Sequence, residues 1–460
     1  MVASWGLHPW SRLPVDVLVS LLSWIDGHVT LFSLLDAMGS ADVRGPLEPL
    51  WQLGTLISRK VLWPQLQLVR SLVVNPTLRV AVEAALPLCT NVRVDWADDI
   101  AWLEVHLRTS MTVEWCARLP ISQITPIPLD EWYSRWARLP LAKVHLASAP
   151  RFRVETFSVP HFRGVLPQCQ QLVSLDLSGD VDVDTIFGLA ASTTSLTHLA
   201  VLFKPTPACV TPATLQSLLQ WLHTTQVQEF RMLEWYLSVD VDPIDRDTLY
   251  SLLFQTHPTL RELMLGYCPL SDLDVPSLSP SLRTLHLAKV GMTSLAFQRL
   301  IDAIRHSCLT TLRLESMTKP TPEDFLNLLP PLVQAVSQST VTTLTLDDCG
   351  ILDSTLKAMC PWLTQATSLR HLSLNKNVIY LGIKNLALAI QGHPALHSLS
   401  LDGNNIDVSG VQALLSTSDS QDKPPTLHTL NLKNNGLYWN SHKAKLENLA
   451  AAKGITLILN

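Results

Sequence analysis

Four short stretches near the end of the chain share one pattern: VTTLTL at 341–346, LRHLSL at 369–374, LHSLSL at 396–401 and LHTLNL at 427–432. In each of them apolar and polar residues alternate, which is typical of a β-strand with one buried and one exposed side. Leu372 and Leu374 are therefore expected to point into a core, and His371 and Ser373 are expected to point away from it. A strand this short needs neighbours to bury its apolar side.

The same pattern recurs along more than half of the chain. Its copies start at 172, 196, 227, 260, 282, 309, 341, 369, 396, 427 and 455, which is a mean spacing of about 28 residues. Between the copies the apolar residues change to helical spacing, as at 215–222, 297–304 and 383–390. The pairs Thr211–Pro212 and Thr321–Pro322 are typical of helix starts. The sequence thus predicts an α/β solenoid built from units of one strand and one helix.

A residue that can satisfy main-chain groups stands eight positions after several of these starts. The residues at this position are Cys268, Cys349, Asn377, Asn404 and Asn435. Amide side chains can bond to neighbouring main chain across a tight turn. We therefore expect the asparagines to hold the turn that ends each strand.

These repeats resemble leucine-rich repeats of the ribonuclease-inhibitor-like class. The resemblance implies a horseshoe with a parallel sheet on the inside and helices on the outside. It covers 172–460, with one more copy at Leu141, Val144 and Leu146 and a weaker one at Val92 and Val94. On this basis the repeat domain is assigned to 141–460.

The first sixty residues form a different kind of sequence, with LPVDVLVSLLSWID at 13–26 and TLFSLLDA at 30–37. Their apolar spacing predicts two short helices separated by a break. The stretch 13–52 resembles an F-box, which implies docking onto a Skp-type adaptor of a cullin-RING ubiquitin ligase. The resemblance makes the following residues the expected adaptor contacts: Leu13, Pro14, Val17, Leu18, Leu21, Leu31, Leu34 and Leu35.

A second interpretation of the same helices is a cap that covers the apolar edge of the first repeat. On the resemblance, 1–60 is assigned to a helical F-box-like domain and 61–140 to a linker and degenerate early repeats. Tryptophans crowd this N-terminal part of the chain, with ten before residue 140 and four after it. We expect them to fill irregular packing between elements that do not repeat cleanly.

Composition predicts a folded protein that acts inside the cell. Apolar residues make up 47% of the chain, charged residues 16%, and the net charge is −5. No apolar run is long enough to cross a membrane, and Arg12, Pro14 and Asp16 interrupt any signal-peptide core. The eight cysteines include no C-x-x-C pair, which favours buried free thiols in a reducing compartment. We expect a cytoplasmic location, with the nucleus as the alternative.

Motifs for catalysis are missing from the sequence. It has no phosphate-binding loop, no G-x-G-x-x-G, no H-E-x-x-H and no G-x-S-x-G. His257, His306 and His393 each stand three residues before the first leucine of a repeat, where they are expected to cap helix carbonyls. The sequence therefore predicts no catalytic residues, no metal and no cofactor, and a protein that is not an enzyme.

Binding is expected on the concave strand face, to which every repeat contributes. Its outward positions hold twice as many acidic residues as Arg and Lys, six against three, so a nucleic-acid groove is disfavoured. The candidate contacts for a target protein are Glu229, Arg231, Glu262, His286, Arg313, Glu315, Asp347, His371, Asn375, Asp402, Asn431 and Lys433.

The two halves together predict a substrate-recognition subunit of a cullin-RING ubiquitin ligase. The F-box-like helices dock on the adaptor, and the repeats hold a target protein whose identity the sequence does not give. The alternative is a leucine-rich-repeat scaffold or inhibitor without a role in ubiquitination, in which the N-terminal helices only cap the solenoid.

Overall fold

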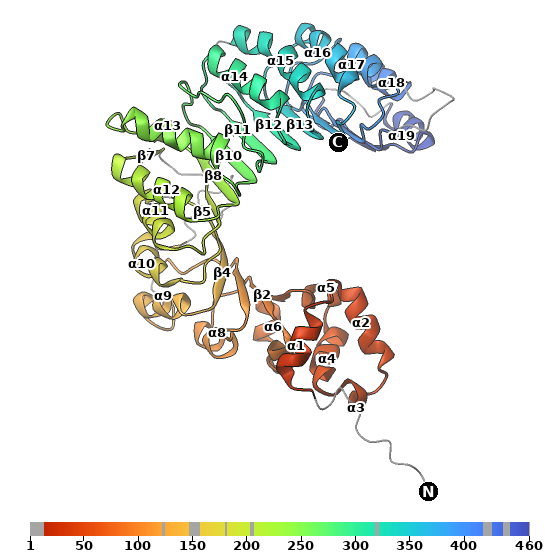
Figure 1. Ribbon diagram of the computed structural model, residues 1–460. Coiled ribbons are helices and arrows are strands. Elements are labelled where there is room, and N and C mark those ends of the chain that lie inside the picture. Colours follow the sequence, from red (N-terminus) through yellow and green to blue (C-terminus); the bar gives the residue numbers. More distant parts are fainter. Residues whose placement is uncertain are drawn as a thin grey trace. The chain divides into compact units, whose positions relative to one another are not determined.

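The computed structural model describes residues 13–121, 125–146, 157–179, 182–202, 207–317, 322–416, 426–435 and 442–459. The chain divides into two compact units, Met1–Pro205 and Thr206–Asn460 (Figure 1). This division falls within the expected repeat region rather than after residue 60 or 140. The expected helical domain and the linker therefore belong to one unit with the first repeats.

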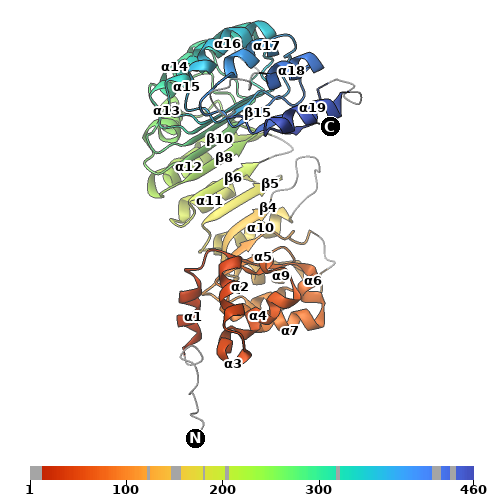
Figure 2. The same ribbon diagram turned by 90° about the vertical axis from the view of Figure 1, so that its right-hand side faces the viewer.

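The first unit opens with six short helical elements, in keeping with the helices expected from the apolar spacing of 13–37. They are α1 (Val15–Leu22), α2 (His28–Ala37), α3 (Ala41–Arg44), η2 (Gly45–Leu47), α4 (Glu48–Leu56) and α5 (Arg59–Leu62). Helix α2 packs on α4 and α5, α4 packs on α7 (Pro76–Ala85), and α1 packs on the 3-10 turn η3 (Leu86–Leu88). Figure 2 shows α1 at the margin of this helical group.

Parallel strands in chain order form the sheet of the first unit. They are β1 (Leu66–Leu68), β2 (Asn91–Val94), β3 (Thr112–Trp115), β4 (Leu141–Leu146), β5 (Ser174–Ser178) and β6 (His198–Leu202). The helical elements between them are α6 (Arg70–Val74), α7, η3, α8 (Ile100–His106), α9 (Leu129–Ala137), α10 (Val159–Val165), η4 (Leu166–Gln168) and α11 (Val183–Ser192). The repeats expected at Val92 and at Leu141 thus form strands, and two more strands precede and separate them.

Tryptophan side chains fill the core beside β3, as the crowding of these residues predicts. Trp115 is fully buried, and its ring lies 6.2 Å from that of Trp132 and 6.0 Å from that of Trp136, edge to face in both cases. This is the geometry that aromatic rings prefer. The rings therefore have a structural role in joining α9 to the sheet.

Parallel strands in chain order also form the main sheet of the second unit. They are β8 (Glu229–Leu233), β10 (Glu262–Gly266), β11 (Thr284–Ala288), β12 (Thr311–Glu315), β13 (Thr343–Asp347), β14 (His371–Ser373), β15 (Ser398–Ser400), β16 (Thr429–Asn431) and β17 (Thr456–Ile458). Two shorter strands, β7 (Ala208–Val210) and β9 (Trp235–Leu237), pair in parallel beside it.

Helices cover one face of this sheet and leave the other open (Figure 1). They are α12 (Pro212–Thr224), α13 (Pro243–Ser251) with the π-helical turn η5 (Leu252–Thr256), α14 (Ser294–Arg305), α15 (Pro322–Ser337), α16 (Asp353–Gln365), α17 (Ile383–Ile390), α18 (Val408–Ser416) and α19 (Lys443–Ala452). Neighbouring helices from α14 to α19 pack side by side. The other consecutive strands of this sheet are joined through a helix, but the segment between β10 and β11 contains none.

The leucines of the repeats build the core between sheet and helices. Leu285, Leu312 and Leu344 lie opposite one another in the register, and all three are fully buried. At Thr211 the expected helix start is present, since the threonine Oγ1 accepts a hydrogen bond from the N–H of Thr214. The second expected start lies partly outside the described residues at Thr321, although α15 begins at Pro322.

A left-handed residue ends nearly every strand of the second unit. Positive φ angles occur directly after the strand at Glu234, Tyr267, Lys289, Ser316 and Asp348, and three residues after the shorter strands β14 to β16 at Lys376, Gly403 and Asn434. In this conformation each N–H turns toward the next repeat, as when Lys376 donates to the carbonyl of Asp402 at 2.7 Å and Asp348 donates to that of Asn375 at 2.8 Å. Main-chain hydrogen bonds thus form the turn itself. A side chain is needed mainly to bond the main-chain groups that are buried under the turn.

The asparagines hold these turns in the way the sequence predicts. Asn404 is buried, its Nδ2 donates to the carbonyls of Leu374 and Leu401, and its Oδ1 accepts from the N–H of Ile379. Asn377 and Asn435 make the same set of bonds in their own repeats. Each asparagine therefore links two adjacent repeats.

Two of the three repeated histidines bond to a carbonyl, but to one in the preceding repeat. His257 Nε2 lies 3.0 Å from the carbonyl oxygen of Leu222, and His393 Nε2 lies 3.1 Å from that of Ala366. Burial lowers the pKa of both imidazoles, so they act as neutral rings and not as cations at a helix end. His306 is exposed, and Ser307 bonds to the carbonyl of Ile304 in its place.

No helix among the described residues is long and apolar enough to cross a membrane. The cysteines in these residues are free, and five of them are buried. Burial raises the pKa of Cys89, Cys169, Cys268 and Cys349 to about 12, so these thiols are protonated at neutral pH.

Candidate interaction surfaces

The expected adaptor contacts separate into an exposed and a buried group. Pro14 is exposed, and Val17, Leu21 and Leu34 keep 42%, 46% and 43% of their surface accessible. Leu13 is half-buried. These residues are therefore available to a partner at the surface of α1 and α2.

Leu18, Leu31 and Leu35 belong to the buried group, with at most 1% of their surface exposed. They pack in the core of the N-terminal helices together with Leu22 and Phe32. The structure gives these three leucines a place in the core, in contrast to the expected role as contacts. Their side chains have no accessible area to offer a partner.

Two further apolar residues on this surface were missed in the sequence. Trp24 is 83% exposed and Val29 is 66% exposed, just after α1 and early in α2. A helix turns by 100° per residue, so Val17 and Leu21 fall on one side of α1 and Leu18 and Leu22 on the adjacent side. That spacing could have separated the two groups, if one side of an almost uniformly apolar helix had been known to face solvent. We call Pro14, Val17, Leu21, Trp24, Val29 and Leu34 the N-terminal apolar surface.

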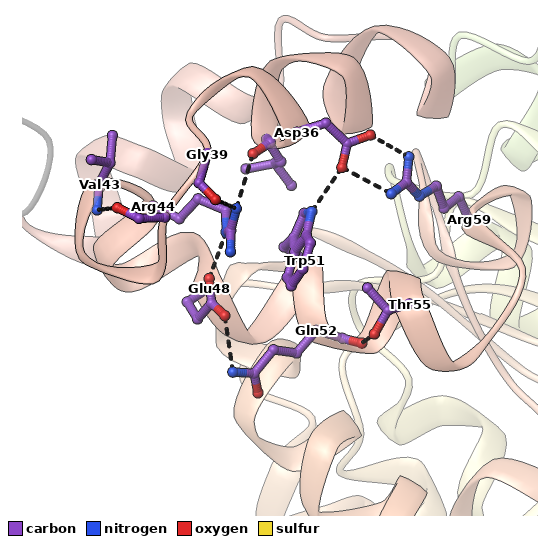
Figure 3. Close-up of polar contacts among 11 residues, drawn as sticks. Asp36, Gly39, Val43, Arg44, Glu48, Trp51, Gln52, Thr55 and Arg59 are labelled. Atoms are coloured by element: carbon purple, nitrogen blue, oxygen red, sulfur yellow. Dashed lines mark hydrogen bonds and ion pairs between the residues drawn. The ribbon is translucent and has the colours of Figure 1, made fainter.

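A polar network links the N-terminal helices to one another (Figure 3). Asp36, at the end of α2, accepts hydrogen bonds from Trp51 Nε1 at 2.8 Å and from both terminal nitrogens of Arg59 at 2.7 and 3.0 Å. The bonds from Arg59, followed by that from Trp51, lower the pKa of the Asp36 carboxyl. The network thus fixes α2 against α4 and α5.

Arg44 forms the second half of the network and is 4% exposed. Its Nε pairs with Glu48 at 2.5 Å, its Nη1 donates to the carbonyl of Gly39 at 3.0 Å, and its guanidinium lies 3.8 Å above the ring of Trp51. A buried cation is stable only when it is paired and hydrogen-bonded in this way. The sequence shows no periodicity for these polar residues, and none of them was predicted.

The expected target contacts all lie in the second unit, on the open face of its sheet or directly beyond the strand ends. The strand register aligns Glu229 with Glu262, Arg231 with the position of His286 and Arg313, and Glu315 with Asp347. The remaining members belong to β14 to β16 and the turns that follow: His371, Asn375, Asp402, Asn431 and Lys433. The structure therefore brings this set onto one continuous surface.

On β8 to β12 the charges of this surface compensate one another. Arg231 Nη2 lies 2.9 Å from Glu262, and Arg231 Nε lies 2.7 Å from Glu229. The Nε–H makes no hydrogen bond within the described residues, so the contact with Glu229 is an ion pair only. His286 Nε2 lies 3.2 Å from Glu315 and lowers the pKa of that carboxyl, with a further contribution from Arg313. A partner that pairs with these groups has to compete with the pairs already present.

On β13 to β16 a chain of hydrogen bonds replaces the ion pairs. Asp347 Oδ1 accepts from Ser373 Oγ at 2.7 Å, and Asn375 Nδ2 donates to Asp347 Oδ2 at 3.0 Å. Ser400 Oγ donates to Asn375 Oδ1 at 2.7 Å and accepts from Asn431 Nδ2 at 2.9 Å. These side chains are fixed by one another before any partner binds, which lowers the entropy lost on binding. Arg313, His371 and Lys433 do not belong to this series of hydrogen bonds, and they are the exposed members of the expected set.

The open face of the first unit carries a charged cluster that lies outside the expected set of target contacts. Glu114 on β3 lies 3.5 Å from Arg93 and 3.9 Å from His145, and it accepts a hydrogen bond from Gln65 at 2.9 Å. Burial raises the pKa of Glu114, but the bond from Gln65 and the charges of His145 and Arg93 outweigh burial and lower it. Asp176 lies 3.8 Å from the other nitrogen of His145. The cluster thus sets one arginine against the carboxylates of Asp95, Glu114 and Asp176, with His145 between the last two.

The described residues contain no group of three or more His, Cys, Asp and Glu side chains arranged to hold a metal. A hollow of about 430 Å³ lies between the end of α9 and η4 and is lined by Arg138, Gln168, Cys169 and Gln171 among others. Its one thiol, Cys169, is buried and has a pKa raised to about 12. A protonated thiol is a weak nucleophile, so the hollow supports no specific reaction.

Comparison of the sequence with models of known protein families found no match, and comparison with curated proteins found none. The function therefore has to be argued from the two surfaces described above.

Proposed function

We propose that this protein is a substrate-recognition subunit of a cullin-RING ubiquitin ligase. The N-terminal apolar surface docks a Skp-type adaptor, and the open sheet face of the second unit binds a target protein. We further propose that the units of strand and helix are leucine-rich repeats and that the open face lines the inside of a horseshoe. The protein acts in the cytoplasm or the nucleus, where such ligases work.

The observation that carries the proposal is the N-terminal apolar surface. Helices α1 and α2 bury one set of leucines and leave Val17, Leu21 and Leu34 together with Trp24 on the outside. Large apolar side chains that gather on one face of a folded protein often mark an interaction site, whereas single exposed ones are ordinary. The residues stand in the stretch that resembles an F-box, in which the expected partner is the adaptor.

The contribution to catalysis is proximity. A ligase that holds a target lysine beside the charged conjugating enzyme raises the local concentration of the reactants. Such a subunit needs no nucleophile of its own. The preorganised polar groups on β13 to β16 suit it to hold a folded or extended protein segment.

The alternative is a scaffold or inhibitor whose N-terminal helices only cap the first strands. The burial of Leu18, Leu31 and Leu35 favours a capping role, as does the hydrogen bond from Trp63 Nε1 to the carbonyl of Ile25 at 2.5 Å. A cap accounts for the buried set, but it leaves the exposed set without a function. The two roles are compatible when opposite sides of the same helices serve them.

The test is capture of a purified Skp-type adaptor by tagged full-length protein. The variant Val17→Asp/Leu21→Asp/Leu34→Asp changes only exposed positions and is expected to weaken capture at least tenfold, since charge is placed in an apolar contact. The matched control is Val80→Asp/Val105→Asp, which alters residues that are 67% and 75% exposed in the same unit. It is expected to bind as the unmodified protein does.

Thermal unfolding of the three proteins separates docking from capping. The proposal predicts that both variants unfold near the temperature of the unmodified protein. Absence of adaptor capture by the unmodified protein contradicts it, as does equal capture by the triple variant. Loss of folding in the triple variant alone favours the cap.

A further inference from the structure

One edge of the main sheet in the second unit is formed by the residues that directly precede the strands. We call these residues the strand-entry edge: Gln228, Arg261, Arg283, Thr310, Thr342, Arg370, His397 and His428. Main-chain bonds hold them in line, because each carbonyl from Gln228 to His397 accepts from two N–H groups of the next repeat. The carbonyl of Arg261, for example, accepts from Arg283 at 2.8 Å and from Thr284 at 2.9 Å.

The strand-entry edge carries three arginines and two histidines and no acidic residue. Arg261, Arg283, Arg370, His397 and His428 are all exposed. The segments that lead into the strands contain no Asp or Glu among the described residues: 225–228, 257–261, 279–283, 306–310, 338–342, 366–370, 393–397 and 426–428. Adjacent strands lie about 4.8 Å apart, so the cations Arg261 and Arg283 stand as neighbours, and Arg370 is followed along the edge by the polar rings of His397 and His428.

Three arginines of the unit that lie off this edge are paired with carboxylates, whereas Arg305 and Arg313 are in no ion pair among the described residues. Arg231 pairs with two glutamates, Arg246 with Asp272 at 2.9 Å, and Arg299 with Asp274 at 2.6 Å.

Within the described part of the chain, by contrast, no ion pair involves Arg261, Arg283 or Arg370. Arg283 Nη1 bonds to the carbonyls of Pro280 at 2.5 Å and Cys308 at 3.5 Å, which orients the guanidinium along the edge but leaves its charge uncompensated.

Helix dipoles do not account for this distribution. Cations are stabilised at a helix C-terminus only within the last turn. Arg370 follows the last residue of α16 by five positions, Arg261 follows that of η5 by five, and no helix precedes Arg283 in its own repeat. The unpaired charges therefore favour an external anion.

We propose that the strand-entry edge binds an acidic segment of a partner protein. This inference rests on the proposed function, in which the second unit recognises a target protein, and it specifies that the target presents a run of Asp or Glu. A nucleic acid fits less well, because the same segments offer no Trp, Tyr or Phe on which bases could stack. The opposite edge mixes carboxylates such as Glu234 and Asp348 with the exposed lysines Lys289, Lys376 and Lys433, so it does not present cations alone to an acidic segment.

Binding of a fluorescein-labelled oligoglutamate peptide to the full-length protein tests the proposal, with anisotropy as the readout at low ionic strength. The variant Arg261→Glu/Arg283→Glu/Arg370→Glu is expected to raise the Kd at least about tenfold, since attraction becomes repulsion. The milder variant Arg261→Gln/Arg283→Gln/Arg370→Gln is expected to have a Kd between those of the unmodified protein and the Glu variant. The matched control reverses as many charges on the opposite edge, at the exposed residues Lys289, Lys376 and Lys433, and is expected to leave the Kd within about twofold.

The outcomes discriminate between the possibilities. Absence of peptide binding, or equal binding by unmodified protein and both edge variants, overturns the proposal. Tighter binding of an oligothymidylate, lost in the edge variants, overturns it in favour of a nucleic acid. Adaptor capture, measured in parallel, is expected to be the same for the edge variants and the unmodified protein. If the adaptor is not captured while the peptide binds at this edge, the proposed ligase function fails and the acidic-segment site stands.

Discussion

The carboxylate of Asp36 meets the guanidinium of Arg59 end to end, with Nη1 2.7 Å from Oδ2 and Nη2 3.0 Å from Oδ1. The two residues are separated by a turn, a short helix and α4, so the pair ties the end of α2 to the start of α5. Arg59 also lies 4.7 Å above the ring of Phe32, which is in the core of the same helices. The pair thus sets the position of α2, which carries Val29 and Leu34 of the N-terminal apolar surface.

Replacement of Asp36 by Asn is expected to lower the thermal unfolding temperature slightly, because the ion pair is partly exposed and screened by solvent. The pKa of Asp36 is lowered below its usual value of 3.8, so the charged form is favoured by folding. Its stabilisation is present above the unfolded pKa and is lost as the pH falls through the folded one. Thermal melts from pH 7 to pH 2 are expected to show a smaller acid-induced loss in Asp36→Asn. Additive effects in the double variant Asp36→Asn/Arg59→Gln would show that the pair does not couple.

The buried asparagines of the turns are expected to be the most sensitive polar positions in the second unit. Asn404→Ala leaves the carbonyls of Leu374 and Leu401 and the N–H of Ile379 without this partner. The expected loss of stability is on the order of 3 kcal/mol, since buried unpaired groups are costly. Its neighbour Asn405 is exposed and serves as the control, with an expected change within about 0.5 kcal/mol. Denaturant unfolding measures both, and equal effects contradict the assigned role.

Acid is expected to weaken the second unit through its buried histidines. In His393 the Nδ1 accepts from the N–H groups of Ala395 and Leu396, so Nε2 carries the proton that bonds to the carbonyl of Ala366. A second proton on Nδ1 would face two donors, and burial lowers the pKa of the ring below 6.5. The unfolded chain therefore binds the proton more readily, and stability falls as the pH drops below about 6.5 and stops falling below the folded pKa.

The measurement for this prediction is urea unfolding at pH 8 and pH 5 for the unmodified protein, His393→Gln and His306→Gln. The His393 variant is expected to lose stability at pH 8 and to show a weaker dependence on pH. His306 occupies the equivalent position but is exposed, so its variant is expected to keep the dependence of the unmodified protein. If the pH dependence of stability is unchanged in His393→Gln, groups other than His393 cause it.

Two glycines are expected to respond oppositely to alanine. A Cβ at Gly382 would lie 2.7 Å from Asp353 Oδ1 and 3.0 Å from its Cα, and Asp353 holds the N–H groups of Tyr380 and Leu381. Gly382→Ala should therefore destabilise, by about 1 to 3 kcal/mol. Gly188 lies inside α11 with no atom within 4 Å of a Cβ, and Gly188→Ala should stabilise by about 0.5 to 1 kcal/mol. Calorimetry of both variants checks the signs.

The sequence predicted those parts of the fold that repeat. Leu372 and Asn404 could be placed correctly because each belongs to a series in which position decides burial. The strands β1 to β3 each offer only two inward apolar residues, as in Val113 and Trp115 on β3, and their spacing is irregular. Such short alternations are too common in any sequence to be distinctive.

The candidate surfaces were harder to predict because they depend on contacts between distant segments. Leu18 and Leu21 are both apolar and both belong to α1, and only the helices packed against one side decide which of them is buried. The contacts of Asp36 with Trp51 and Arg59 likewise join residues that no local pattern relates. Ion pairs such as that of Arg231 with Glu262 required the register of the strands, which the alignment of the repeats supplies only once the sheet is known.

The pairing along the strand-entry edge also bears on how such a chain can change in length. From β10 to β13 each strand pairs residue for residue with the next, and each junction uses the same carbonyl with the same two N–H groups. Removal of 310–341 would present the carbonyl of Arg283 to Thr342 and Thr343, which are the groups that Thr310 bonds at present. One repeat unit can therefore be duplicated or lost as a whole. Such a change alters the size of the binding face while the hydrogen bonds between neighbouring repeats stay the same.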